Sequence, residues 1–502
     1  MKIWLSALLL LLSQCYILGQ GAHYWSQNFN EESSLLSGAV VGGGAGNASV
    51  YYNPASIAES EGSSLAVNAS LFSLDFYSAK NALGDDINLS STKITLQPRF
   101  ISYNWDPSKT SKFSFEFIIM NTQLYDLQFN NSVSYQMDIL EYLPGEERYF
   151  ANFSYNNYYR EDWVGGGASY ALNDHFYLGA SMFVKVKSMR YNSLVDIQAH
   201  SLTDTVEVGG IQVPFYSASY NEYQDLKFNN YRLIWKFSMF YLKDRFTGGI
   251  TISTPSLNVY SDGKMVSKKF EQSNISNPVG VGFLPNIMII DYRDKKGVNI
   301  NYKDPLSIAA GAVFKTRDNK QAVYTTVEYF FPVDPYKIVQ VDPNPMVSNS
   351  QTYSNLPTKE FLSYGYANTG VFNAAVGYQW TPREHLRLLG GFRTDFNYQK
   401  GLDYGEYIDY NSIRQITYDL YHLTGGAVFT FKGQDIMFGL QYTLGYQGNE
   451  PQIINLSDPV EFNIEEQAAL QGTRSDNMRN IANKVGVFFG ATFNFMTGKT
   501  SK

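Results

Sequence analysis

The residue types that most often carry chemistry are few in this chain, and they are not spaced for catalysis. The chain has five histidines: His23, His175, His200, His385 and His422. No two of them have the spacing of a metal-ligating pair, and no Gly-x-Ser-x-Gly nucleophile motif occurs. The one cysteine, Cys15, has no second thiol with which to form a disulfide or a thiolate metal site. We therefore expect no enzyme activity, no cofactor and no metal, although an acid–base site assembled from distant strands would leave no local pattern.

Three charged residues near the C-terminal third of the chain could bind a ligand. Arg387, Arg393 and Asp395 alternate with apolar residues between 384 and 400, so one face of a strand there would be charged. A guanidinium group binds a carboxylate through two parallel hydrogen bonds, which makes Arg387 and Arg393 candidate ligand-binding residues. The alternative is that these charges pair with each other, or with another part of the chain, inside a polar lumen. Both interpretations stay open at this point.

The stretch from Gly38 to Glu61 is rich in small residues and precedes the first long strand pattern. Small residues let one backbone approach another closely, because little or no Cβ stands between them. Asn53 can cap a helix and Pro54 has the φ angle of a first helical position, so a short helix is predicted through 55–60. The glycines at 42–46 lack the spacing of the glycine-rich phosphate loops. The sequence therefore predicts a closely packed structural segment here.

The composition is aromatic and poor in charge. Among 502 residues, 39 are Tyr and 34 are Phe, and 17 % are charged, whereas soluble domains average about 25 % charged residues. A barrel in a lipid bilayer needs aromatic girdles and an apolar outer face, so this composition favours one. The formal net charge of −7 provides no basic surface for nucleic acid.

The N-terminus has the pattern of an export signal. Lys2 precedes an apolar run and small residues follow it, which predicts a signal peptide over 1–21 with cleavage between Gly19 and His23. A lipoprotein signal ending at Cys15 is the alternative, although glutamine is a poor match for the position before a lipidated cysteine. After this segment, no run of about 18 apolar residues predicts a spanning helix.

Apolar and polar residues alternate with a period of two through the rest of the chain. From Val485 to Phe495, for example, every second residue is apolar, and the residues between are mostly small or polar. Alternation over ten or more residues fits a tilted strand with one face toward lipid and one toward a lumen. About fourteen such strands are predicted: 63–78, 92–105, 112–127, 152–172, 175–195, 226–242, 245–260, 305–316, 320–332, 362–380, 384–400, 416–432, 434–447 and 484–496.

The connections between these strands alternate between short and long. Short turns join the second strand to the third, the fourth to the fifth, and so on to the twelfth and thirteenth. The intervening connections are long: 128–151, 196–225, 261–304, 333–361 and 448–483. Short periplasmic turns alternating with long external loops are typical of outer-membrane barrels. The sequence thus predicts an all-β fold, a transmembrane antiparallel β-barrel of about fourteen strands.

The sequence GNASVYYNPASIA, at 46–58, resembles the N-terminal signature of the outer-membrane long-chain fatty-acid transporter family, the FadL/TodX-like proteins. In that family an Asn-Pro-Ala motif lies in a plug folded inside a barrel of about fourteen strands. The resemblance implies a plug motif formed by Asn53, Pro54 and Ala55, with Gly46 and Asn47 as weaker members.

The resemblance also implies a function, passive uptake of long-chain fatty acids or other hydrophobic small molecules through a lumenal pocket when the plug moves. It implies a signal peptide at 1–21, a plug at 22–62 and a barrel at 63–502 in the outer membrane of a Gram-negative cell. We expect a hydrophobic ligand and membrane lipid as partners, no nucleic acid, and a monomer. Two alternatives stay open: a related barrel that binds or shuttles secreted proteins, and a general hydrophilic porin, which a plug argues against.

Overall fold

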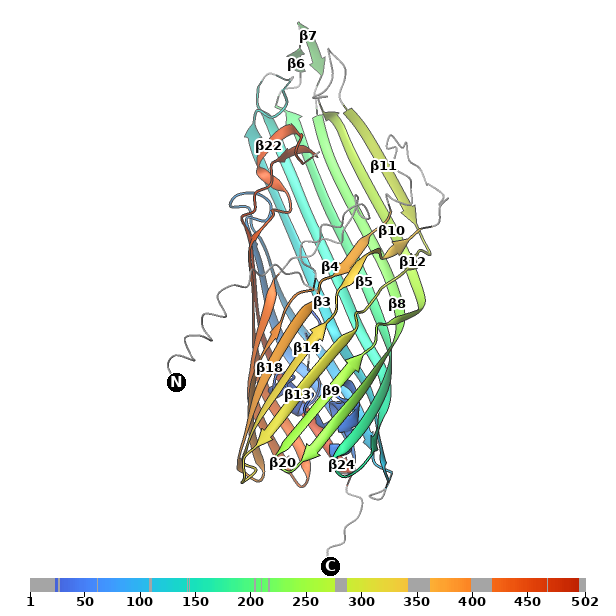
Figure 1. Cartoon of the computed structure of the whole chain (residues 1–502). Helices are drawn as coiled ribbons and strands as arrows, with labels where there is room; N and C mark the ends of the chain where they lie inside the picture. The colour runs from blue at the N-terminus through green and yellow to red at the C-terminus, as the bar shows by residue number, and fades with distance from the viewer. Residues whose placement is uncertain are drawn as a thin grey trace, which may run out of the picture.

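A computed structural model describes residues 23–25, 28–60, 62–107, 111–141, 143, 145–202, 205–208, 210–214, 217–275, 287–341, 362–398, 418–466 and 468–495. Within these residues, fourteen antiparallel strands form a closed barrel (Figure 1), because β8 pairs with β5 on one side and with β9 on the other. The barrel strands are β1 (Ser63–Lys80), β2 (Leu89–Trp105), β3 (Phe113–Met137), β4 (Glu147–Ala171), β5 (Phe176–Ser201), β8 (Ser217–Lys243), β9 (Phe246–Ser253), β13 (Ser307–Lys315), β14 (Gln321–Phe330), β18 (Val371–Arg383), β19 (Leu386–Asp395), β20 (Asp419–Phe431), β21 (Gln434–Glu450) and β24 (Met478–Phe495).

The prediction of an all-β barrel of about fourteen strands is confirmed, and each predicted strand overlaps one barrel strand. The predicted long loops at 128–151 and 196–225 are wrong, because β3, β4, β5 and β8 continue through most of these residues. These four strands have 25–27 residues, whereas about 9–11 residues cross a bilayer. Their inner faces remain buried above the bilayer region because they pack on a large aromatic cluster that includes Tyr155, Tyr191 and Phe228.

The other strands lie around the end of the barrel opposite the short turns. There β10 follows β9 along the chain and pairs with the upper part of β8, and β11 pairs with β10. The predicted loops at 261–304, 333–361 and 448–483 also contain strands. These additional strands are β6 (Thr205–Val208), β7 (Ile211–Pro214), β10 (Leu257–Ile275), β11 (Ile287–Lys295), β12 (Asn299–Ile300), β15 (Val333–Lys337), β16 (Val339–Gln340), β17 (Gly365–Asn368), β22 (Asn455–Asn463) and β23 (Ala468–Gly472).

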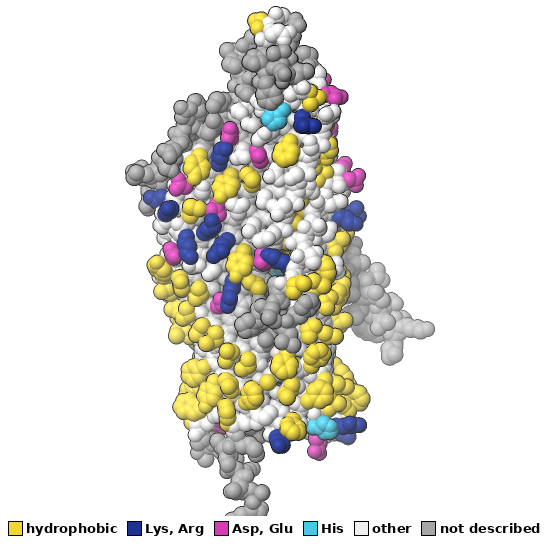
Figure 2. Space-filling view, turned by 180° about the vertical axis from the view of Figure 1, so that it is seen from behind, with side chains coloured by type: hydrophobic (Ala, Val, Ile, Leu, Met, Phe, Trp, Pro, Cys, Tyr) yellow, Lys and Arg dark blue, Asp and Glu magenta, His cyan; other side chains and the backbone are white. Residues whose placement is uncertain are grey.

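On the face shown in Figure 2, large apolar side chains cover the lower half of the barrel, whereas charged side chains gather above them. The predicted facing of β24 is confirmed, because Phe489 is 42 % exposed and the adjacent Phe488 is 2 % exposed. Phe117, Phe237 and Phe438 on other strands are also exposed. An apolar band flanked by aromatic residues is the lipid-facing surface of a membrane barrel. Among the described residues, no helix has the length and apolar character needed to cross a membrane.

The segment before β1 lies inside the lower part of the barrel (Figure 1, dark blue). It contains α2 (Glu31–Leu35), η1 (Gly46–Ala48), α3 (Ser49–Tyr52) and η2 (Pro54–Glu59). The helix α2 contacts β19, β20, β21 and β24, whereas η2 contacts β3, β4, β5 and β8. Residues 23–25 and 28–60, hereafter the N-terminal segment, therefore touch opposite sides of the barrel wall.

Candidate functional site

The Asn-Pro-Ala motif holds a tight turn at the start of η2. The side chain of Asn53 accepts a hydrogen bond from Ala55 N (3.1 Å), and Pro54 occupies the first turn of the helix, which confirms the predicted cap. The Asn53 amide nitrogen donates to the carbonyl of Val41 (2.8 Å), and the residue is fully buried. A single side chain thus joins the turn to the glycine-rich stretch before it.

Glycines in the barrel wall let this turn approach the strands backbone to backbone. A Cβ on Gly179 of β5 would lie within 3.0 Å of backbone atoms of Pro54 and Ala55. A Cβ on Gly249 of β9 would overlap the Asn53 amide and the Val41 carbonyl in the same way. Since real Cβ atoms essentially never lie that close to other atoms, these positions admit only glycine while the segment is docked.

Hydroxyl groups beside these glycines hold the backbone of the segment. The Ser238 hydroxyl accepts a hydrogen bond from Ala55 N (2.8 Å), and Ser169 donates to the Ala55 carbonyl (2.9 Å). Thr251 donates to the carbonyl of Tyr52 (2.9 Å). Each bond contributes about 1 kcal/mol, so the segment is held by several small interactions that can be exchanged for others.

The weaker members of the predicted motif lie near β1. Gly46 has a φ of 51°, which favours glycine, and a Cβ there would meet the side chains of Asn30 and Glu32. The Asn47 side chain accepts a hydrogen bond from the Ser64 hydroxyl (2.9 Å). The motif residues therefore lie in two groups, one near β1 and one against β4, β5, β8 and β9.

The structure brings the predicted charged residues of β19 to the N-terminal segment. Arg387 forms ion pairs with Glu32 of α2 and with Asp435 of β21, both at 2.7 Å. Asp395 accepts a hydrogen bond from Trp25 N (3.0 Å). Arg393 is 1 % exposed, and its guanidinium nitrogens have no hydrogen-bond acceptor among the described residues. Arg387 thus holds the segment to the barrel wall, whereas Arg393 is buried without a hydrogen-bond acceptor among the described residues.

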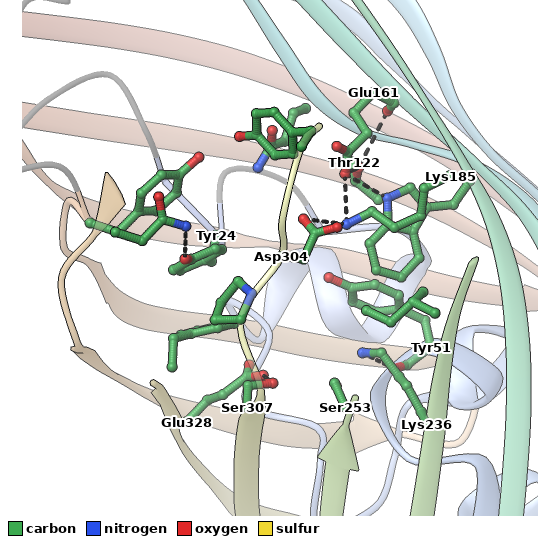
Figure 3. A pocket seen from close by; sticks show the side chains of 18 residues that line it. Tyr24, Tyr51, Thr122, Glu161, Lys185, Lys236, Ser253, Asp304, Ser307 and Glu328 are labelled. Atoms are coloured by element: carbon green, nitrogen blue, oxygen red, sulfur yellow. Dashed lines mark hydrogen bonds and ion pairs between the residues drawn. The ribbon is translucent and has the colours of Figure 1, made fainter. Parts of the chain in front are cut away.

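A small cavity of about 60 Å³ lies between the N-terminal segment and the upper part of the barrel (Figure 3). Tyr24 and Tyr51 of the segment form part of its wall, and side chains from seven barrel strands and from the connections around them form the rest. The barrel strands contribute Thr122, Gln123, Glu161, Trp163, Lys185, Ile234, Lys236, Ser253, Ser307, Glu328 and Phe330, and the connections contribute Tyr302, Asp304, Pro305, Asn368 and Tyr398.

Four charged side chains, three of them buried and one half-buried (Asp304), form a closed network beside this cavity. Lys185 pairs with Glu161 (3.2 Å) and with Asp304 (2.8 Å). Arg232 pairs with the same two carboxylates, each at 2.5 Å. Burial disfavours the charged form of Asp304, but Arg232 and Lys185 hold the pKa of this carboxyl below its usual range. Through Asp304, the network fixes the connection at 301–306 to the barrel wall. Removing one partner would leave a buried charge unpaired, which is strongly destabilising.

Lys236 connects the cavity directly to the N-terminal segment. Its ammonium donates to the Tyr51 carbonyl (2.8 Å) and lies 4.0 Å from the centre of the Tyr51 ring. On the opposite wall, the Glu328 carboxylate accepts hydrogen bonds from the Trp25 indole (2.6 Å) and from Ser307 (2.7 Å). The segment is thus anchored beside the cavity by one cation and one anion.

Sequence reasoning did not single out Glu161, Arg232, Lys236 or Asp304 as site residues. The first three occupy inward positions on long strands, and a charge at such a position is the signal that could have found them. The pairing of these residues could not be predicted from the sequence, because Asp304 lies far along the chain and reaches the network only in the folded barrel.

The five histidines lie at separate places in the fold. Burial lowers the pKa of His23 to about 3, and its ring is 3.0 Å from the Tyr418 carbonyl. His175 lies at the edge of an exposed turn. Among the described residues, no group of three or more His, Cys, Asp or Glu side chains could hold a metal ion.

These features define a membrane-spanning β-barrel with an N-terminal segment docked in its lumen. No family model and no curated protein matches the chain. The solved structure of a Pseudomonas aeruginosa FadL homologue matches with a TM-score of 0.53 at 11 % identity, over 95 % of this chain and 100 % of that one. The fold of this chain is therefore that of the FadL homologue, as the sequence resemblance implied.

Two further solved structures match with lower TM-scores. The Pseudomonas putida toluene transporter TodX has a TM-score of 0.48 at 13 % identity, over 95 % of this chain and 99 % of that one. The CymD monoaromatic hydrocarbon channel has a TM-score of 0.44 at 11 % identity, over 93 % of this chain and 97 % of that one.

Proposed function

We propose that this protein is an outer-membrane transporter for the passive uptake of long-chain fatty acids or other hydrophobic small molecules. The N-terminal segment is the plug in this proposal, and its displacement opens the lumen. The observation that carries the proposal is that the segment closes one side of the lumenal cavity while being held by small polar contacts. The fold likeness to a FadL homologue supports it.

The size of the cavity supports a moving plug. At about 60 Å³ it is smaller than the roughly 150 Å³ cavity known to bind benzene. Because Tyr24 and Tyr51 belong to the segment, displacing the segment enlarges the cavity. An apolar solute that crosses in this way avoids water, which stabilises it by about 0.8 kcal/mol for each CH₂ group.

Binding of a secreted protein is a second candidate function. The observation in its favour is the length of β3, β4, β5 and β8, which rise far beyond the apolar belt and carry charged side chains on their outer faces (Figure 2). Such a wall offers a partner a larger surface than a small-molecule channel needs. Co-purification of one stoichiometric protein with the intact barrel would favour this function.

Uptake by whole cells tests the proposed function. Cells carrying the protein should take up a labelled long-chain fatty acid or another hydrophobic compound faster than cells lacking it. Asn53→Ala should lower uptake per folded barrel, because it removes the cap and the bond to Val41, at about 1 kcal/mol each. Asn88→Ala is the matched control, because Asn88 accepts a similar bond from Asn81 N in an exposed turn. An unchanged ratio of uptake to folded protein for Asn53→Ala would leave this residue as a purely structural cap.

A further inference from the structure

The outward face of β8 marks where the apolar belt ends. From Tyr241 up to Tyr231, every second residue on this face is aromatic or aliphatic. This length matches the about 9–11 residues of a strand that crosses a bilayer, and tyrosines at both ends suit its two interfaces. The ring of Tyr231 lies 5.6 Å from that of Tyr260 on β10, which is 62 % exposed. The upper boundary of the belt on this wall therefore lies at these two tyrosines.

Four outward-facing cations lie directly beyond this boundary, one on each of four adjacent strands. Arg190 of β5 pairs in register with Lys227 of β8, and Lys227 lies opposite Met265 of β10. The residues on either side of Arg190 and Lys227 along the chain are buried inside the barrel, so both side chains point outward. The four residues, hereafter the cation row, are Arg160 of β4, Arg190, Lys227 and Lys264 of β10.

The centre of the cation row holds two like charges directly opposite each other. Lys227 forms an ion pair with Asp225 (2.9 Å), but its side chain is still 43 % exposed. Arg190 is exposed and forms no ion pair with any of the described residues. Like charges directly opposite in an antiparallel pair destabilise the sheet. Anionic groups bound beside Arg190 and Lys227 would remove this repulsion.

The two ends of the cation row are also open to solvent. Arg160 donates two hydrogen bonds to Asp162, at 2.7 and 3.0 Å, and its side chain is 50 % exposed. Lys264 lies exposed in a β-bulge, where it forms no ion pair within the part of the chain that the structure describes. Asp262 lies opposite Asn229 and does not pair with Lys264. Because adjacent strands are about 4.8 Å apart, the row is about 14 Å long, which is more than one phosphate group covers.

We propose that the cation row binds a membrane lipid whose head group carries two phosphate groups. One phosphate lies between Arg160 and Arg190, where guanidinium groups match its geometry, and the other lies between Lys227 and Lys264. Below them the acyl chains lie on the apolar belt. There the cross-strand partners Val164 and Val184 are 48 % and 40 % exposed.

The position of the cation row favours a lipid over a soluble anion. The row lies at the height of the lipid head groups, and basic side chains there attract anionic lipids. The formal net charge of −7 gives the chain no general attraction for anions in solution. This inference goes beyond the proposed uptake function and does not depend on it, because it needs only a barrel embedded in a bilayer.

Lipid binding to delipidated full-length protein in detergent micelles tests the inference. Native mass spectrometry compares diphosphoryl lipid A, monophosphoryl lipid A and phosphatidylethanolamine. The wild type should bind the diphosphoryl form at least about fivefold more tightly than the monophosphoryl form. Arg190→Gln/Lys264→Gln should weaken binding of the diphosphoryl form about 25-fold, because each basic residue near a membrane surface contributes about fivefold.

The matched control is Lys243→Gln/Arg245→Gln. This variant makes the same change in charge at exposed positions by the short turn between β8 and β9, at the other end of the belt. It should keep the wild-type affinity for diphosphoryl lipid A. Because all four positions are exposed, both variants should fold, and circular dichroism checks that they do.

Three results would overturn the inference. The first is equal affinity of the wild type for diphosphoryl lipid A and phosphatidylethanolamine. The second is a folded Arg190→Gln/Lys264→Gln protein with wild-type affinity, or a control variant that loses as much affinity as this one. The third is a protein that co-purifies with the wild type and is lost from Arg190→Gln/Lys264→Gln while lipid binding stays unchanged, which would assign the cation row to a protein contact.

Discussion

Replacing Gly249 by alanine should force the N-terminal segment off the barrel wall. Gly249 faces the lumen from β9, and a methyl group there would overlap the Asn53 amide and the Val41 carbonyl. The Asn53 side chain is fully buried, so it has no free space into which to rotate. The turn that carries the motif must therefore move as a unit.

The cost follows from the contacts that are lost. Asn53 Nδ2 bonds to the carbonyls of Val41 (2.8 Å) and Met239 (3.4 Å), at about 1 kcal/mol each. Overpacking adds about 1–3 kcal/mol, so the docked state loses about 3–5 kcal/mol. The ladder between β9 and β13 involves backbone groups and stays intact. We expect a folded barrel with a detached segment.

The adjacent residue provides the control. Gly248 faces outward, and a Cβ there would meet its nearest neighbour, Phe246, at an ordinary 3.4 Å. In planar bilayers, Gly249→Ala should conduct small ions at least tenfold more often than the wild type, and Gly248→Ala should match the wild type. Equal conductance of the two variants, with both folded, would refute the reasoning that glycine at 249 exists for plug docking.

Three further results are expected. Phe489→Arg should destabilise the barrel by about 2–4 kcal/mol if it lies near mid-membrane, and Thr492→Arg on the inner face should cost less; equal shifts in unfolding would contradict the facing. Deleting residues 24–60 should leave a barrel that inserts but conducts ions, and a folded, ion-tight deletion variant would contradict the plug. Because burial lowers the pKa of His23 to about 3, a detached segment binds the proton more readily, so protease protection of the segment should weaken as the pH falls from about 6 to 4. His23→Gln should flatten that pH dependence, and an unchanged slope would assign it to other groups.

The barrel could be predicted from the sequence because the alternation of side chains is a local property. Each strand shows this alternation independently of its partners. The count of fourteen strands and the facing of Phe489 and Thr492 could therefore be predicted. How far the strands extend beyond the bilayer could not be predicted. Alternation marks an inward face whether the outer face meets lipid or water, so the pattern itself does not show where the bilayer ends.

The site was only partly predictable, for a related reason. The Asn53 cap is a local interaction and was foreseen. In the sequence, Gly179 and Gly249 are glycines inside a strand, which usually weaken it. Their role in docking shows only in the folded barrel, where the segment lies against them. Lys236 and Tyr51 meet only because the segment folds back into the lumen, and no spacing in the sequence records that contact.

A reversible cross-link between the plug and the wall tests the central claim most directly. The Ser37 and Thr424 hydroxyl oxygens lie 2.7 Å apart, so cysteines at these positions should form a disulfide. The account predicts that cells carrying the oxidised Ser37→Cys/Thr424→Cys protein take up a hydrophobic probe no faster than cells lacking the barrel. A reductant should restore uptake by these cells to the wild-type rate. Undiminished uptake by the fully cross-linked protein would contradict a moving plug.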